Sequence, residues 1–163
     1  MSDDALMAEA KKFEKNLLNF FWRQGVSCSE GEDLVQETFL RLWKYRGEYV
    51  RTAKLSTFLF LLARQVRIDA LRRQVRREHR EERWGKDQPA FAPPKRFGVR
   101  EDVRWAVARL SEPLRDVVEL GVFQDLPYAE VAEILGIPVG TVKSRMHNAL
   151  KELKETFDHE QRP

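Results

Sequence analysis

The sequence predicts an all-α protein made of two small helical domains joined by a flexible linker. Apolar residues recur every three or four positions along most of the chain, and the alternating polarity typical of strands is almost absent. Residues 85–98 are the exception, because they contain three prolines and two glycines and show no periodicity. We therefore predict a domain over residues 1–83, a linker over residues 84–99 and a second domain over residues 100–163.

The charge is distributed unevenly along the 163 residues, of which 42% are hydrophobic and 34% charged. Residues 1–50 carry seven Lys or Arg against nine Asp or Glu, a net charge of −2. Residues 64–83 carry eight Arg against four Asp or Glu, a net charge of +4. An acidic front and a basic middle indicate surfaces that face different partners.

Several classes of function are disfavoured by what the sequence lacks. Cys28 is the single cysteine, and no Cys/His cluster has the spacing of a metal site. No Ser/His/Asp set and no phosphate-binding glycine loop is visible, so the chain is not expected to be an enzyme or to bind a metal or cofactor. We expect no signal peptide, because acidic residues replace the basic start of one, and the most apolar run, residues 55–66, is too short to span a bilayer. We expect a cytoplasmic protein without membrane insertion.

Three helices are predicted in the first domain. Residues 6–21 form one apolar stripe, and a second helix follows a cap at residues 27–29 and ends near Gly47. A long third helix is predicted from residue 56 to about residue 83, with an apolar front half and an arginine stripe behind it. The residues expected to be buried in the second and third helices are Leu34, Val35, Thr38, Phe39, Leu42, Leu59, Leu62, Ala63, Val66 and Ala70. Trp22, Trp43 and Trp105 are assigned to packing.

The second domain ends in a predicted helix-turn-helix over residues 126–153. A short helix at residues 128–135, with Val131, Ala132 and Leu135 expected to face inward, is followed by a tight turn at Gly136, and a second helix begins near residue 139. The second helix has Val142, Met146, Ala149, Leu150 and Leu153 at buried spacing. Its exposed front is expected to hold Thr141, Lys143, Ser144, His147 and Asn148, with Arg145 at the flank. Such side chains contact base edges and phosphates in the major groove, although the same face would also suit a solvated bundle helix.

Three runs of sequence carry a family resemblance. Residues 33–43 read DLVQETFLRLW, and they resemble the core-binding helix of bacterial RNA polymerase sigma factors of the extracytoplasmic-function (ECF) group, in the sigma-70 family. Residues 58–73 read FLFLLARQVRIDALRR, and they resemble the promoter-melting helix of that group. Residues 108–110 with Pro113, and residues 136–145, are similar to its C-terminal domain. These runs follow one another in the family's order and lie on both sides of the predicted linker.

The resemblance implies an alternative sigma factor that directs core polymerase to specific promoters and helps to melt the −10 element. The first domain would grip the clamp helices of the largest polymerase subunit, and the second would bind the flap of the second-largest subunit and read the −35 element. The factor is expected to be a monomer when free, and to be silenced by an anti-sigma factor or another inhibitor.

The resemblance and the residue chemistry together nominate three sets of site residues. The core-binding set is Asp33, Gln36, Glu37, Leu40 and Arg41, a polar face suited to charge-assisted bonds. The −10 set is Lys54, Ser56, Thr57, Phe58, Gln65, Arg72, Arg73, Arg76 and Arg77, which combines phosphate-binding cations with Phe58 as a stacking surface beside Tyr49. The −35 set is Thr141, Lys143, Ser144, Arg145, His147 and Asn148. Family members commonly carry Trp at position 58 and Asn at position 65.

Other readings remain at this point. A conventional DNA-binding regulator would need a dimer interface and a palindromic site, and no heptad repeat or spare apolar stripe provides one. It would also leave residues 33–43 unexplained. A helical adaptor or anti-termination module would bind protein without binding DNA.

Overall fold

The computed structural model describes residues 2–49, 54–82 and 99–160, and every regular element within these ranges is helical. The elements are α1 (Asp3–Lys11), α2 (Glu14–Arg23), α3 (Cys28–Tyr45), the 3-10 turn η1 (Arg46–Glu48), α4 (Leu55–Glu82), α5 (Val99–Arg109), α6 (Glu112–Val118), the π-helical turn η2 (Glu119–Phe123), α7 (Tyr128–Leu135) and α8 (Val139–Glu160). The all-α prediction is therefore confirmed. The predicted linker lies outside the described residues, apart from Val99 at the start of α5.

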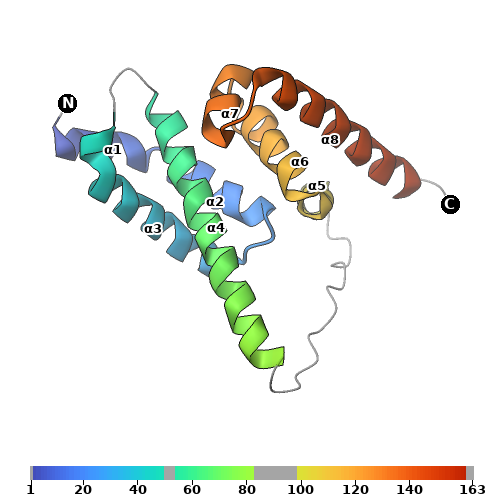
Figure 1. The fold of residues 1–163 in the computed structure, drawn as a ribbon, viewed down its shortest axis with the longest axis horizontal. Helices are drawn as coiled ribbons and strands as arrows, with labels where there is room; N and C mark the ends of the chain where they lie inside the picture. The colour runs from blue at the N-terminus through green and yellow to red at the C-terminus, as the bar shows by residue number, and fades with distance from the viewer. Residues whose placement is uncertain (1, 50–53, 83–98, 161–163) are drawn as a thin grey trace.

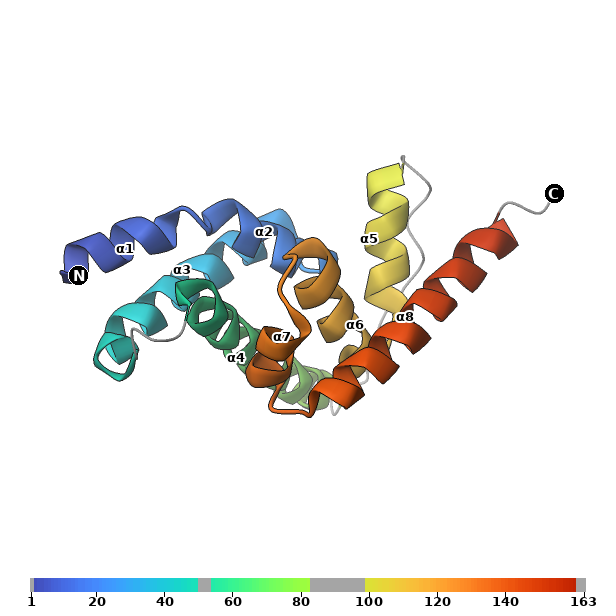
Figure 2. The same cartoon turned by 90° about the horizontal axis from the view of Figure 1, so that it is seen from above.

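The helices form two groups that pack against each other. Helices α1 to α4 lie on one side of the molecule and α5 to α8 on the other, with the two chain ends far apart (Figure 1). Seen from above, α7 lies beside α4 (Figure 2), and residue contacts join α4 to α7 and α2 to α5. The two groups are in direct contact, so the candidate surfaces of one domain lie next to elements of the other.

The predicted first helix is in fact two helices, α1 and α2. At the break, the Lys12 N–H donates to the Glu9 carbonyl and the Phe13 N–H donates to the Ala10 carbonyl, so the usual four-residue hydrogen bonds shorten to three residues. The apolar stripe continues across this turn. The break lets α2 bury both Phe20 and Phe21, whose rings pack edge to face at 5.1 Å.

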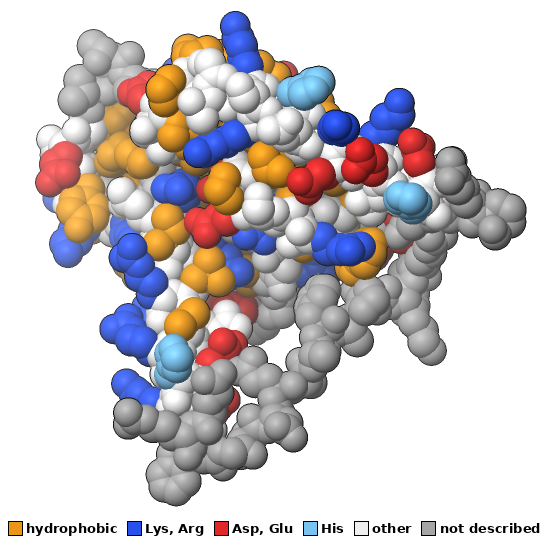
Figure 3. Space-filling view, turned by 45° about the vertical axis from the view of Figure 1, so that its right-hand side comes forward, with side chains coloured by type: hydrophobic (Ala, Val, Ile, Leu, Met, Phe, Trp, Pro, Cys, Tyr) orange, Lys and Arg blue, Asp and Glu red, His pale blue; other side chains and the backbone are white. Residues whose placement is uncertain are grey.

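Helices α3 and α4 form the core of the first group as predicted. The Ser27 hydroxyl accepts a hydrogen bond from the Glu30 N–H at 3.3 Å and caps α3. All ten residues predicted to be buried in these two helices are buried. Beyond Ala70, α4 projects from the core, and basic side chains gather along this lower end in the space-filling view (Figure 3).

The helix-turn-helix has the predicted bounds, and its turn depends on Gly136. This residue has φ +67 and ψ 34, the left-handed conformation that glycine adopts at little cost. Two packing predictions were wrong in detail. Leu150 is 48% exposed, because it lies about 80° around α8 from Val142, at the edge of the buried stripe. In α7, Ile134 is buried whereas Leu135, at the helix end, is only partly so.

Replacing Gly136 with alanine should lower the free energy of unfolding by about 1 kcal/mol, since an L-residue in the left-handed region carries that cost. The measurement is the denaturant midpoint of the full chain at an unchanged slope. Gly140→Ala is the matched control, because Gly140 is helical and a Cβ there would meet open space. Its midpoint should stay the same or rise slightly. Equal losses in the two variants would contradict this account of the turn.

Candidate functional site

The outward face of α3 combines charge with exposed apolar area. Asp33 and Gln36 are exposed as predicted, and Leu40 is 68% exposed. Trp43, one turn further along, is 43% exposed, so its assignment to packing was wrong. The Arg46 guanidinium stacks on its ring at 4.0 Å. Trp43 lies three residues after Leu40, and residues at this spacing share one face of a helix, so the sequence did contain a signal for its exposure. Two large apolar side chains among charges are typical of a protein-binding surface.

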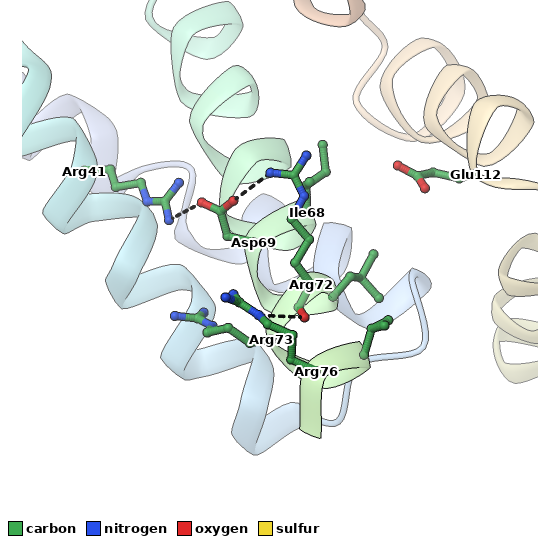
Figure 4. Close-up of a pocket in the computed structure, with 9 residues that line it drawn as sticks. Arg41, Ile68, Asp69, Arg72, Arg73, Arg76 and Glu112 are labelled. Atoms are coloured by element: carbon green, nitrogen blue, oxygen red, sulfur yellow. Dashed lines mark hydrogen bonds and ion pairs between the residues drawn. The ribbon is translucent and has the colours of Figure 1, made fainter. Parts of the chain in front are cut away.

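Two residues of the predicted core-binding set are engaged within the protein itself. Arg41 donates to Glu37 at 2.9 Å and to Asp69 of α4 at 2.7 Å, and Arg73 donates to the other Glu37 oxygen at 3.3 Å. Figure 4 shows the side chains of Arg41 and Asp69 pointing toward each other. Burial lowers the pKa of Arg41, but the hydrogen bonds that Arg41 donates to Asp69 and Glu37, and the attraction of their charges, outweigh this effect, so the pKa is raised overall. This network couples α3 to α4. Asp69 was not predicted as a site residue, and its signal in the sequence is a carboxylate within an arginine-rich helix.

The four arginines of α4 that were predicted to bind the −10 element line two separate hollows. Arg72, Arg73 and Arg76 line a groove of about 1030 Å³ whose floor includes Ile68, Leu71 and Val75, with Glu112 of α6 across from them (Figure 4). Arg77 lines a separate, more polar hollow with Gln74, Glu30, Glu78 and Glu81. The structure thus brings three of the four predicted arginines together and leaves Arg77 beside acidic side chains.

The start of α4 is covered by α7. Glu130 of α7 pairs with Lys54 at 2.9 Å, and its second oxygen accepts a hydrogen bond from the Thr57 hydroxyl at 3.2 Å. Thr57 is buried, whereas Gln65 further along is exposed. The remaining predicted side chains here are Ser56 and Phe58, both half-buried, and the Phe58 ring lies 5.4 Å from that of Tyr49. Part of the predicted −10 set is therefore occupied by the other domain.

A buried ion pair joins the two domains at a second place. Arg23 donates two hydrogen bonds of 2.7 Å to the two carboxylate oxygens of Glu119, whose side chain is 0% exposed. The Arg23 guanidinium also lies over the Phe123 ring, 4.1 Å from its centre. Nearby, Arg64 donates to Asp116 at 3.3 Å. Burial raises the pKa of Glu119 and that of Asp116 even though an arginine beside each acts in the opposite direction.

The front of α8 presents the predicted −35 set to solvent. Lys143, Ser144, His147 and Asn148 are exposed. Thr141 and Arg145 are half-buried at the flanks. Helix α8 packs mainly against α6 and α7 of its own domain, and its exposed front can approach a groove while α7 remains on α4.

Comparison with known proteins identifies both halves of the chain. Residues 10–77 match the family Sigma-70 region 2, and residues 100–153 match the family Sigma-70, region 4. The ECF RNA polymerase sigma factor RpoE of Cereibacter sphaeroides is 31% identical over 157 residues, which cover 94% of this chain and 87% of that protein. The chain belongs to the ECF sigma factors of the sigma-70 family. The resemblance inferred from the sequence is confirmed.

Two further relatives of this sigma factor support the assignment and the fold. The ECF RNA polymerase sigma factor SigL of Mycobacterium tuberculosis is 34% identical over 149 residues, covering 83% of this chain and 81% of SigL. The sigma factor RpoE from Bartonella quintana, solved in complex with the anti-sigma factor NepR, superposes with a TM-score of 0.78 at 24% identity. The match covers 93% of this chain and 95% of that one, and it shows a shared fold.

The part of the sigma factor that the structure describes holds neither a metal-binding cluster nor a membrane-spanning helix. Among residues 2–49, 54–82 and 99–160, no group of three or more His, Cys, Asp or Glu is placed to hold a metal ion. No helix in these same ranges is long and apolar enough to cross a membrane.

The network between α3 and α4 can be tested with two double-mutant cycles. Arg41→Ala and Asp69→Ala should show a coupling free energy of about 0.5–1 kcal/mol, because both side chains are partly exposed and water screens the pair. The matched cycle of Arg72→Ala with Asp69→Ala should give a value near zero, since those charges are 3.9 Å apart and more exposed. Urea unfolding of the four variants in each cycle provides the values. Equal coupling in the two cycles would contradict the geometry.

Proposed function

We propose that this sigma factor binds core polymerase and promoter DNA through two separate faces, one in each domain. Residues 1–83 bind the clamp helices of core polymerase through α3 and the −10 element through α4. Residues 100–163 bind the flap and read the −35 element through α8. The observation that carries the proposal is the pair of exposed faces, apolar and charged on α3 and polar and basic on α8.

The α3 face suits a basic protein partner with an apolar patch. Leu40 and Trp43 provide the apolar area that becomes buried, and Asp33 and Gln36 provide exposed polar groups beside it. Glu37 and Arg41 act differently in this proposal, because their bonds to Asp69 and Arg73 hold α3 in register with α4. Core binding and −10 binding therefore take place on helices that are fixed to each other.

Both promoter elements lie on one duplex, and this sets how far the domains must separate. The elements are about 25 base pairs apart, which is about 85 Å at about 3.4 Å per base pair. The 16 residues from 83 to 98 can span at most about 55 Å, and the 28-residue helix α4, which separates Lys54 and Thr57 from this segment, adds about 42 Å. The chain is long enough for both elements once the domains have moved apart.

We further propose that the protein acts in the cytoplasm, works without catalytic activity of its own, and is monomeric when free. Relatives of the same fold are known with inhibitors bound: the Bartonella quintana protein was solved with the anti-sigma factor NepR. An anti-sigma factor is accordingly the inhibitor proposed for this chain.

Run-off transcription with purified core polymerase on a promoter library tests the proposal as a whole. Transcripts that start at a small set of promoters, and appear only when the protein is added, are expected. Specific promoter binding by the protein alone, without any stimulation of core enzyme, would instead favour a conventional DNA-binding regulator.

The α3 face can be tested by charge reversal. Asp33→Lys should weaken core polymerase binding by about tenfold, the effect of about 1.4 kcal/mol at an interface with charge complementarity. Affinity is measured by fluorescence anisotropy with labelled protein. Glu14→Lys, the same reversal at an exposed site in α2, is the control and should bind as the wild type does. An unchanged affinity of the Asp33→Lys variant for core polymerase would contradict the placement of α3 in the polymerase interface.

The two DNA faces should differ in the kind of defect that they produce. Lys143→Ala should change which −35 sequences are selected from a randomised library, because a base contact is worth about 1–3 kcal/mol of discrimination. Arg76→Ala should weaken all promoters alike and reduce the dependence on salt, because a phosphate contact carries no sequence information. Selection followed by sequencing distinguishes the two. An unaltered −35 preference in Lys143→Ala would exclude it as a base-reading residue.

A further inference from the structure

The exposed ring of Trp43 is held by Arg46, the residue that follows the last turn of α3. The Arg46 guanidinium lies over the ring, 4.0 Å from its centre, and its Nη1 donates a hydrogen bond to the Trp43 main-chain carbonyl. This carbonyl belongs to the end of α3, where main-chain carbonyls lack partners further along the helix. One guanidinium is therefore fixed against both the backbone and the side chain of Trp43.

The Arg46 guanidinium is held in turn by a carboxylate from a different helix. Its Nε donates to Oδ2 of Asp3 at 2.8 Å, across 43 residues of sequence. Asp3 is the first residue of α1, whose start is capped by the Ser2 hydroxyl, which accepts a hydrogen bond from the Ala5 N–H at 3.2 Å. Helix α1 packs against α3 (Figure 1), so this contact joins the start of one helix to the end of the other.

The Asp3–Arg46 pair is too exposed to contribute much to the stability of the fold. The Asp3 side chain is 56% exposed and that of Arg46 is 34% exposed, and water screens pairs of this kind. Its effect is on geometry, because a guanidinium is planar and its donors point in fixed directions. A carboxylate at Nε and a carbonyl at Nη1 fix the plane of the group, and the Trp43 ring stacks on that plane. Asp3 thus controls the orientation of the ring through Arg46.

We infer that Asp3 is a positioning residue of the polymerase-binding face, which acts through Arg46 to hold the Trp43 ring in the orientation that core polymerase contacts. The inference rests on the proposed function of the α3 face, where Trp43 and Leu40 are the exposed apolar side chains. A ring that is already ordered loses less conformational freedom on binding than a free ring does, so the gain appears as affinity. Helix α1 therefore contributes to polymerase binding, although the predicted core-binding set contains none of its residues.

Three variants of the full chain separate positioning from net charge. Asp3→Ala removes the carboxylate that holds the guanidinium. Arg46→Lys keeps the positive charge but loses the planar group that stacks on the ring and bonds at two nitrogens. Asp4→Ala is the matched control, because Asp4 is the next residue in the first turn of α1, is exposed, and forms no ion pair with the part of the chain that the structure describes. It removes the same charge from the same end of the same helix.

Two measurements follow the ring and its consequence for binding. Fluorine NMR of protein labelled with fluorotryptophan reports on each tryptophan, and the Trp43→Phe variant identifies the resonance of Trp43. Asp3→Ala and Arg46→Lys should both change the position of that resonance, whereas Asp4→Ala should leave it as in the wild type. Fluorescence anisotropy with core polymerase should show an affinity about threefold lower for Asp3→Ala and Arg46→Lys, the effect of ordering one side chain, and an unchanged affinity for Asp4→Ala. In a Trp43→Ala background, Asp3→Ala should cause no further loss.

An unchanged Trp43 resonance in Asp3→Ala would overturn the positioning of the ring. A changed resonance with the affinity of the Asp4→Ala control would overturn its role in polymerase binding. An equal loss of affinity from Asp3→Ala with and without Trp43 would do the same, because Asp3 would then act independently of the ring. The wild type is scored separately for binding to core polymerase. Its failure to bind would reject the proposed function, and a changed resonance in Asp3→Ala would then support the positioning of Trp43 alone.

Discussion

The packing of α4 between α3 and α7 sets the position of every candidate surface in the first domain. One side of its front half is buried against α3, and the Arg41–Asp69 bond continues that contact beyond the apolar core. Its start lies under α7, and its far end carries the arginines into solvent. A helix of 28 residues is about 42 Å long, so one rigid element joins the proposed polymerase-binding face on α3 to the proposed nucleic-acid face. The second domain therefore contacts only part of α4, and the far end of the helix stays exposed.

Much of this arrangement could be predicted from the sequence because its signals are local. Helical periodicity identified the buried faces of α3 and α4, and Gly136 identified the turn of the helix-turn-helix. The exposed front of α8 followed from the same periodicity, which also explains why Leu150, at the margin of the stripe, was placed wrongly. The break between α1 and α2 had no such signal. No glycine or proline marks it, and the turn is set by the burial of Phe20 and Phe21 in the tertiary structure.

The ion pairs could not be predicted, because they join residues that are distant in sequence. Arg41 and Asp69 are 28 residues apart, and Arg23 and Glu119 are 96 residues apart. Periodicity places such side chains on the outside of their own helices, and nothing local tells a solvated charge from a paired one. For this reason Glu37 and Arg41 were assigned to polymerase alone, although they also hold α3 to α4. The sequence of a two-domain protein does not show whether a charged side chain faces solvent or pairs with a residue of the other domain.

The contact between the domains combines apolar packing with buried charge. The buried apolar residues of both domains form one continuous core, and the Arg23–Glu119 pair joins the domains as well. Burial raises the pKa of Glu119 and that of Asp116 although an arginine lies beside each, so these carboxylates are desolvated at a cost that the pairing does not fully offset. The same contact buries Thr57 and pairs the largely exposed Lys54 with Glu130, and it leaves Lys143 and Asn148 exposed. The proposed −35 face is therefore accessible in this arrangement, whereas Thr57 of the proposed −10 set becomes accessible only if α7 leaves α4.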